Sequence, residues 1–135
     1  MNRVVLDTNV IISAALVPHG TQASILLLAS SGKIAMYVSA PVLAEYEGVL
    51  RRARFKLTAH RIDEILYAIR RIAQPVIPRA KLTVSPDESD NRFLECAEAA
   101  RADHLVTGNT KHFPARYKTT AVVTGRHFLD LLTGE

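Results

Sequence analysis

The chain opens with Arg3-Val4-Val5-Leu6-Asp7-Thr8-Asn9-Val10-Ile11-Ile12. Residues 3–6 form a short run of mostly β-branched apolar side chains, which predicts a strand buried on both faces. Thr8 and Asn9 are residues that cap and turn, and residues 10–16 are apolar enough to continue as a buried helix. Asp7 therefore stands at the carboxyl end of a buried strand, where open α/β sheets bind ligands. The alternative interpretation is that Asp7 only caps the following helix.

Outward from this stretch, strand-like and helix-like segments alternate along the chain. Further strands are predicted at residues 34–38, 76–77, 104–107 and 120–124. Helices are predicted over 21–30 and 125–132. Two further helices have apolar stripes: one runs from Pro41 to Leu50, and the other follows the cap Thr58 and runs to Ile72. Another helix begins at Asp87 or Ser89. This alternation predicts an α/β fold, a three-layer α/β/α sandwich with a mainly parallel central sheet, and residues 1–135 fit a single domain.

Composition and charge narrow the class of protein. The chain is 48% hydrophobic and 22% charged, which is typical of a folded globular protein and excludes a disordered chain. A net charge of +4 is compatible with an anionic partner. The single cysteine, Cys96, excludes an internal disulfide framework and a Cys-rich zinc site, and we expect it to be a buried small apolar residue. With no targeting segment or membrane-spanning stretch evident, we expect a cytoplasmic protein without a membrane partner.

Two further groups of acidic residues stand out. Glu45 lies at the edge of the apolar stripe of its predicted helix and is half turned inward, unless it is an exposed Glu paired with Arg51 or Arg52. The run Pro-Asp-Glu-Ser-Asp-Asn at residues 86–91 begins another helix. The helix dipole favours acids at that position, but three acids within four residues also repel one another. Such crowding is usually tolerated where a divalent cation offsets it.

Four blocks of the chain resemble, in order, those of the PIN-domain nucleases. They are Val-Val-Leu-Asp-Thr-Asn-Val at 4–10, Ser-Ala-Pro-Val-Leu-Ala-Glu-Tyr-Glu-Gly-Val-Leu at 39–50, Asp-Glu-Ser-Asp-Asn-Arg-Phe-Leu-Glu-Cys-Ala at 87–97, and Ala-Asp-His-Leu-Val-Thr-Gly-Asn at 102–109. The chain is most similar to the small stand-alone members that act as toxins of toxin–antitoxin pairs. Each block alone is weak evidence for this resemblance, whereas four blocks in the right order, spanning nearly the whole chain, are strong evidence.

This resemblance implies a metal-dependent endoribonuclease that hydrolyses RNA phosphodiester bonds with a metal-activated water. Asp7, Glu45 and Asp90 would match the family's first three acids and bind Mg²⁺ or Mn²⁺, with Asp87 assisting. The chemistry agrees, because hard cations prefer carboxylate oxygens and a bound metal activates water. The resemblance also implies RNA as substrate, a small antitoxin protein as partner, and a homodimer or higher oligomer.

The fourth block departs from the family pattern. Many members carry an acid shortly after the strand and its Thr, where this chain has Asn109. We expect Asn109 to complete the catalytic set through its amide oxygen, which adds no charge, so that a second metal would bind more weakly or arrive with substrate. Lys111 and His112 follow and could contact the phosphate, or else Lys111 is solvated and His112 packs on the loop. Asp103 precedes its strand and is expected at the opposite edge of the sheet.

The middle of the chain is basic. It contains Arg51, Arg52, Arg54, Lys56, Arg61, Arg70, Arg71, Arg79 and Lys81. Arg51, Arg52 and Arg54 follow Glu45 closely and are expected to bind phosphates that flank the scissile one. The alternatives are a solvated helix surface or a patch covered by an acidic segment of a partner. Two functions remain open: the ribonuclease, and a catalytically weakened or inactive α/β scaffold that binds protein or nucleic acid.

Overall fold

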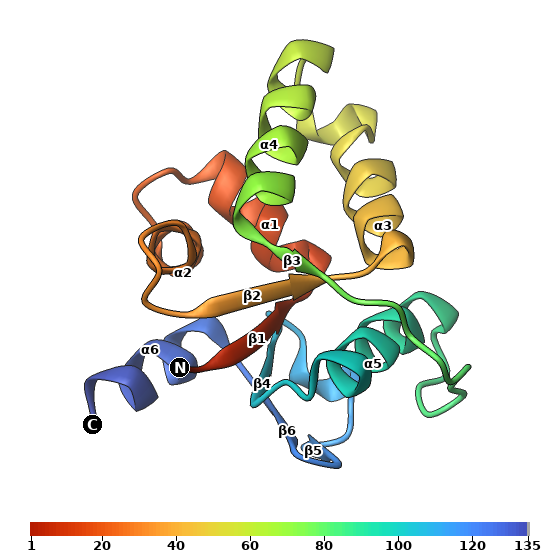
Figure 1. Cartoon of the computed structure of the whole chain (residues 1–135). Coiled ribbons are helices and arrows are strands. Elements are labelled where there is room, and N and C mark those ends of the chain that lie inside the picture. Colours follow the sequence, from red (N-terminus) through yellow and green to blue (C-terminus); the bar gives the residue numbers. More distant parts are fainter. Residues whose placement is uncertain (135) are drawn as a thin grey trace.

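The structure, a computed structural model, describes residues 1–134 and contains one six-stranded sheet (Figure 1). The strands are β1 (Arg3–Leu6), β2 (Ala35–Val38), β3 (Gln74–Pro75), β4 (His104–Val106), β5 (Arg116–Tyr117) and β6 (Thr120–Val123), in the order β3-β2-β1-β4-β6-β5. Every neighbouring pair is parallel except β5 with β6. The predicted mainly parallel sheet is therefore confirmed.

Helices cover both faces of this sheet. They are α1 (Thr8–Leu16), α2 (Thr21–Ser30), α3 (Ala40–Leu50), α4 (Ala59–Ile72), α5 (Glu88–Ala100) and α6 (Gly125–Thr133), with 3₁₀ turns η1 (Ala53–Phe55) and η2 (Thr110–His112). Figure 1 shows α2 and α6 on one side of the strands and α5 on the other, which confirms the three-layer α/β/α sandwich. Within residues 1–134 no single helix is long and apolar enough to cross a membrane, and only α1 and α2 taken together, across a 101° bend, reach that length and composition.

The central strands are buried on both faces, as the apolar run at the start of the chain predicts. Val4, Val5 and Leu6 of β1 are fully buried, because helices pack on each side of the sheet. Cys96, on α5, is also fully buried, and burial raises the pKa of its thiol to about 12. The expectation that Cys96 is a buried small apolar residue is confirmed.

Some predicted boundaries are wrong. The strand expected at residues 76–77 lies instead at Gln74–Pro75, and the side chain of Ile77 is 85% exposed. The hydrogen bonding between β3 and β2 ends with Val76, whose N–H donates to the carbonyl of Val38 at 2.8 Å. Pro75 and Pro78 have no N–H, so a longer ladder cannot form there. The short antiparallel strand β5 was not predicted, because two residues carry no readable periodicity.

Helix starts follow the capping residues. Asp7 caps α1, which begins at Thr8. Ser39 caps α3, which begins at Ala40, one residue before the predicted start, so that Pro41 is its second residue and not its first. Thr58 caps α4 as predicted, and of the two starts considered for α5 the structure has Asp87 as the cap. At each start a backbone N–H of the first turn donates a hydrogen bond to the side-chain oxygen of the cap.

The order of the strands decides where a ligand can bind. From β1 the chain moves outward through β2 to β3, and then returns to place β4 and β6 on the other side of β1. The direction of winding therefore reverses between β1 and β4. In open parallel sheets, the crevice at such a reversal, beyond the carboxyl ends of the strands, is the usual place for ligands. Here that crevice begins at Asp7, after β1, and Thr107, after β4.

Candidate functional site

A hollow of about 490 Å³ lies at this edge of the sheet. Four acidic residues line it: Asp7 after β1, Glu45 on α3, and Asp87 and Asp90 at the start of α5. Arg52, Asn109 and His112 line the same hollow. The structure thus brings together side chains that lie up to about a hundred residues apart in the sequence.

Asp7 is 7% exposed and both of its carboxylate oxygens accept hydrogen bonds. Oδ1 accepts from the backbone N–H of Thr8 at 2.7 Å, and Oδ2 accepts from the hydroxyl of Thr107 at 2.7 Å. Burial raises the pKa of Asp7, these two hydrogen bonds oppose the rise, and the negative charge of Asp87 adds to it. Asp7 therefore caps α1 and also holds a fixed carboxylate in the hollow, so the two interpretations of this residue are compatible.

Asp90 is equally buried, at 7% exposure, but its hydrogen bonding is incomplete. Among the described residues, its Oδ2 atom has no hydrogen-bond partner although the atom is buried. Burial, followed by the negative charges of Asp7 and Asp87, raises the pKa of Asp90 from 3.8 to about 6. The nearest basic group is His112, whose Nδ1 lies 3.5 Å from Oδ2 and forms an ion pair only when the ring is protonated. An unpaired buried carboxylate oxygen is costly to keep, and it marks a place where a cation would be stabilised.

Glu45 and Asp87 complete the acidic wall of the hollow. Glu45 is half-buried, and no side-chain hydrogen bond or ion pair within residues 1–134 involves it. The alternative pairing with Arg51 is not formed, because Arg51 bonds Glu47 at 2.9 Å and Asp63 at 3.3 Å. Asp87 is exposed, and its Oδ1 accepts from the N–H and the hydroxyl of Ser89, which lower the pKa of Asp87.

These residues have the chemistry that Mg²⁺ or Mn²⁺ requires, which is a set of carboxylate oxygens with an unsatisfied acceptor at the centre. In the part of the chain that the structure describes, no three His, Cys, Asp or Glu side chains are grouped closely enough to enclose a cation as they stand. Glu45 has no side-chain partner within residues 1–134, so rotation of its side chain toward Asp90 is open, whereas Asp87 is held by the two hydrogen bonds from Ser89. The types of donor in the hollow therefore suit a hard divalent cation.

The predicted phosphate-binding residues divide between the hollow and its surroundings. Asn109 and His112 face one another, with Asn109 Nδ2 3.0 Å from His112 Nε2. Lys111 lines a smaller adjoining hollow of about 430 Å³, which it shares with His112. Arg52 lines the acidic hollow, whereas Arg51 lines neither and is held by its two ion pairs.

Sequence reasoning missed two residues that hold the site together. Thr107 donates to Asp7 and also accepts from the backbone N–H of Asn109 at 3.0 Å. A signal was available, because Thr107 directly follows a strand and the carboxyl ends of parallel strands meet at one edge. Tyr46 lies within the helix predicted from Pro41 to Leu50, where nothing in the sequence marks it as polar, yet its hydroxyl donates to the carbonyl of Leu6. Asp103 lies at the opposite edge, as expected, and accepts from the N–H of Arg3.

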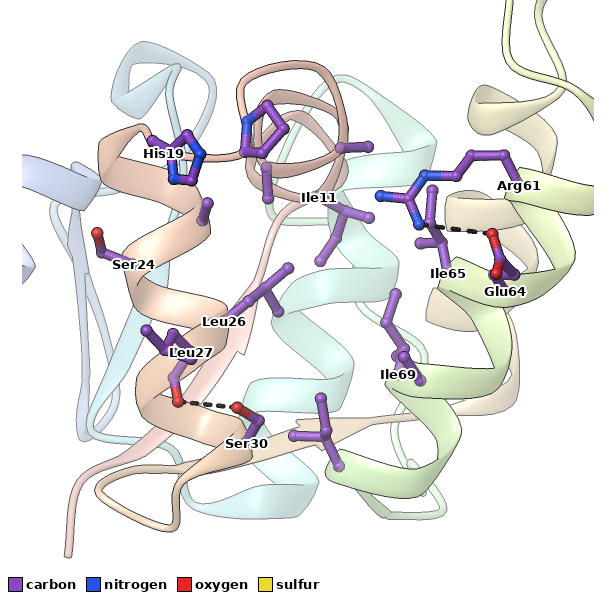
Figure 2. A pocket seen from close by; sticks show the side chains of 16 residues that line it. Ile11, His19, Ser24, Leu26, Leu27, Ser30, Arg61, Glu64, Ile65 and Ile69 are labelled. Atoms are coloured by element: carbon purple, nitrogen blue, oxygen red, sulfur yellow. Dashed lines mark hydrogen bonds and ion pairs between the residues drawn. The ribbon is translucent and has the colours of Figure 1, made fainter.

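A second hollow of about 470 Å³ lies between α1, α2 and α4 (Figure 2). Ile11, Leu26, Leu27 and Ile69 line it, and Figure 2 shows the side chains of Ile11, Leu26 and Ile69 pointing into the space between the helices. Arg61 and Glu64 form an ion pair at 3.9 Å on its α4 side. Leu27 is 68% exposed, so this groove presents apolar surface to the outside.

Comparison with known proteins agrees with this architecture. A family model described as the PIN domain matches residues 3–111. An uncharacterised protein of Methanocaldococcus jannaschii is 34% identical over 110 residues, which cover 79% of this chain and 70% of that protein. The crystal structure of VapBC2 from Rickettsia felis, bound to a DNA fragment from its promoter, contains a chain of similar fold, with a TM-score of 0.58 at 21% identity over 89% of this chain and 96% of that one. The chain described here therefore belongs to the PIN domain family.

Proposed function

We propose that this protein is a Mg²⁺- or Mn²⁺-dependent endoribonuclease. The observation that carries the proposal is the buried Oδ2 atom of Asp90, which lacks a hydrogen-bond partner within the described chain and faces the charges of Asp7 and Asp87. A protein keeps such an arrangement at a cost in stability, and a cation that joins the carboxylates removes that cost. Membership of the PIN domain family supports nuclease chemistry at this hollow.

The residues of the hollow have separate tasks in this proposal. Asp7, Glu45 and Asp90 hold the cation, and Asp87 assists from the start of α5. A cation bound there would lower the pKa of an attacking water and neutralise charge on the phosphate. The amide of Asn109 orients water beside the carboxylates without adding charge. Arg52 on one side, and Lys111 and His112 on the other, bind the phosphates of the RNA.

Cleavage assays test the proposal directly. Labelled structured RNAs and single-stranded DNA are incubated with the purified chain in Mn²⁺, in Mg²⁺ and in EDTA. We expect metal-dependent cutting of RNA that is lost in Asp7→Asn. Asp103→Asn is the matched control, because Asp103 lies at the opposite edge of the sheet and accepts from Arg3 N–H. Cutting that persists in EDTA, or that Asp7→Asn retains, would contradict the assignment.

Metal binding has a readout that does not depend on activity. At about a hundred times its dissociation constant, Mn²⁺ should raise the free energy of unfolding by roughly 2.7 kcal/mol. Asp7→Asn should remove that gain and Asp103→Asn should keep it. A protein that binds Mn²⁺ without cutting any nucleic acid would support the other function considered above, an inactive scaffold in which Asn109 has replaced an acid.

We further propose that the protein is the toxin of a toxin–antitoxin pair. The support is the similarity of fold to a chain of VapBC2, which is described as a complex with a promoter DNA fragment. A toxic ribonuclease should arrest growth when it is expressed alone, and Asp7→Asn should relieve the arrest while accumulating to the same level. Equal growth of cells that express the two forms would contradict this role.

The apolar groove between α1, α2 and α4 is the surface we assign to the antitoxin. It offers exposed apolar side chains, and the chain carries a net charge of +4, so an amphipathic helix with acidic flanks would fit. Sedimentation of the wild type and of Leu27→Glu tests this assignment. A monomer in both cases leaves the groove free for the antitoxin. A dimer that Leu27→Glu dissociates would instead assign the groove to a second copy of the chain.

A further inference from the structure

The 3₁₀ turn η1 brings an aromatic ring and two cations to the rim of the acidic hollow. Arg52, Arg54 and Phe55 all line the hollow that contains Asp7, Glu45 and Asp90. Phe55 is half-buried, since it packs against the core while also lining the hollow. In the described chain neither Arg52 nor Arg54 forms an ion pair, although Arg51 beside them forms two. The two free guanidinium groups are therefore available to an anion.

Arg54 and Phe55 form a stacked pair. The guanidinium carbon of Arg54 lies 4.8 Å from the centroid of the Phe55 ring, within the range of a cation–π contact. A flat aromatic ring and a flat guanidinium group are both surfaces on which nucleobases stack. The pair thus combines attraction for a phosphate backbone with a planar platform for a base.

The backbone holds this platform in place from both ends. Before the turn, Arg51 ties the end of α3 to Asp63 on α4. Within it, the N–H of Phe55 donates to the carbonyl of Arg52 at 3.1 Å. After it, Lys56 adopts a left-handed conformation with φ of 54°, which reverses the chain toward α4. These contacts define the backbone of the turn that carries the ring.

We propose that the Arg54–Phe55 pair is a stacking platform for one base of a single-stranded nucleic acid, next to the phosphate that lies over the acidic hollow, with Arg52 binding the adjoining phosphate. In a duplex the base faces are already covered by neighbouring bases, so the platform selects single strands and loops. The inference deepens the proposed function, on which it rests, by naming the form of its substrate.

Binding rather than cleavage tests the platform. In the Asp7→Asn background, fluorescence anisotropy measures the affinity for a labelled single-stranded RNA, a single-stranded DNA of the same sequence, and the corresponding RNA duplex. Phe55→Leu keeps an apolar side chain against the core and removes the ring. We expect it to weaken binding of the single-stranded RNA by about 5- to 100-fold, and to leave duplex binding unchanged.

Tyr67→Leu is the matched control for this substitution. Arg71 lies over the ring of Tyr67 at 5.8 Å, but this pair is on the exposed surface of α4 outside the acidic hollow. We expect Tyr67→Leu to bind single strands like the parent. Equal losses in both variants, or a loss in Phe55→Leu that is the same for duplex and single strand, would overturn the proposal.

The salt dependence of RNA affinity distinguishes the contribution of charge from that of stacking. Arg52→Gln should reduce the slope of log affinity against log salt by about 0.7 for single strands, whereas Phe55→Leu should leave the slope unchanged. If Arg52→Gln and Arg54→Gln leave RNA binding unaltered, the proposal fails.

A fluorescent reporter gives a second readout. The chain contains no Trp, so Phe55→Trp introduces a single indole at the platform. Its emission should fall on addition of the single-stranded RNA and stay constant with inorganic polyphosphate, which offers charge without bases. An equal response to polyphosphate would overturn stacking. A chain that shows the stacking signal but cuts no RNA would leave the platform standing and remove the nuclease function, so the two failures are distinguishable.

Discussion

The hydroxyl of Tyr46 donates a hydrogen bond of 2.5 Å to the backbone carbonyl of Leu6. Tyr46 follows Glu45 on α3, and Leu6 precedes Asp7 at the end of β1, so this one bond joins the backbones that carry two of the proposed metal ligands. Tyr46 is fully buried, and burial raises the pKa of its hydroxyl well above 10. The group therefore stays protonated and remains a donor at any physiological pH.

Removing this hydroxyl should loosen the acidic hollow. Tyr46→Phe keeps the ring and leaves the carbonyl of Leu6 without that donor, so we expect the free energy of unfolding to fall by about 1–2 kcal/mol. Urea denaturation measures the loss, and a Mn²⁺ titration should give weaker binding. Tyr67→Phe, which removes an exposed hydroxyl, is the control and should change stability by less than about 0.5 kcal/mol. Similar losses in both variants would contradict a special role for Tyr46.

Thr107 should matter through its hydroxyl rather than its shape. Thr107→Val leaves Oδ2 of Asp7 buried and without its donor, which we expect to cost about 1–3 kcal/mol of stability. Thr107→Ser retains the hydroxyl and should recover most of that loss. Thermal unfolding of both variants, alone and combined with Asp7→Asn, measures the coupling between the two residues. Additive losses in the double variant would show that the bond contributes nothing.

Asp90 should make the metal-free protein less stable at neutral pH than at mildly acidic pH. Its pKa is about 6 in the folded chain against an ordinary value of 3.8, so between those values the folded state binds the proton more tightly. Its contribution to the free energy of unfolding therefore falls as pH rises from 4 to 6, and the penalty is fully present above 6.

Asp90→Asn should remove this penalty. We expect the variant to be more stable than the wild type at pH 7 by on the order of 1 kcal/mol, with the difference shrinking as the pH approaches 4. Thermal unfolding from pH 4 to 8 in EDTA checks this. In Mn²⁺ the wild type should show the reverse trend, because the cation needs the ionised carboxylate and its stabilisation should fade below pH 6. A stability difference that is independent of pH would contradict the assignment.

Asn109→Asp should strengthen metal binding and weaken the metal-free fold. A fifth carboxylate in the hollow adds repulsion on the order of 1 kcal/mol and attracts Mn²⁺ by a similar amount, or about fivefold in affinity. Calorimetric titration with Mn²⁺ measures the gain. Thr119→Asp adds the same charge in the turn between β5 and β6 and should leave Mn²⁺ affinity unchanged. Equal affinities in the wild type and Asn109→Asp would mean that this position does not face the cation.

The sequence predicted the fold well because the signals it rests on are local. The apolar run before Asp7, the cap at Thr58 and the 3.6-residue stripe of α4 each depend on neighbours within a few residues. The failures occurred where local signals are weakest: the strand at 76–77 was displaced by prolines, and β5 is only two residues long. The family resemblance added the order of the acids along the chain.

What the sequence determined by itself was the α/β/α architecture and the identity of the acids that end near one edge of the sheet. Only the tertiary structure decided how those acids behave, because their environment is made by residues distant in the chain. The bond from Thr107 to Asp7 spans 100 residues and the bond from Tyr46 to Leu6 spans 40. The tertiary structure also gives two adjacent arginines different surroundings. Arg51 pairs with Asp63, whereas Arg52 lines the hollow. Burial and charge repulsion act through space, so the pKa of Asp90 is raised only when folding buries its carboxyl group and brings Asp7 near it.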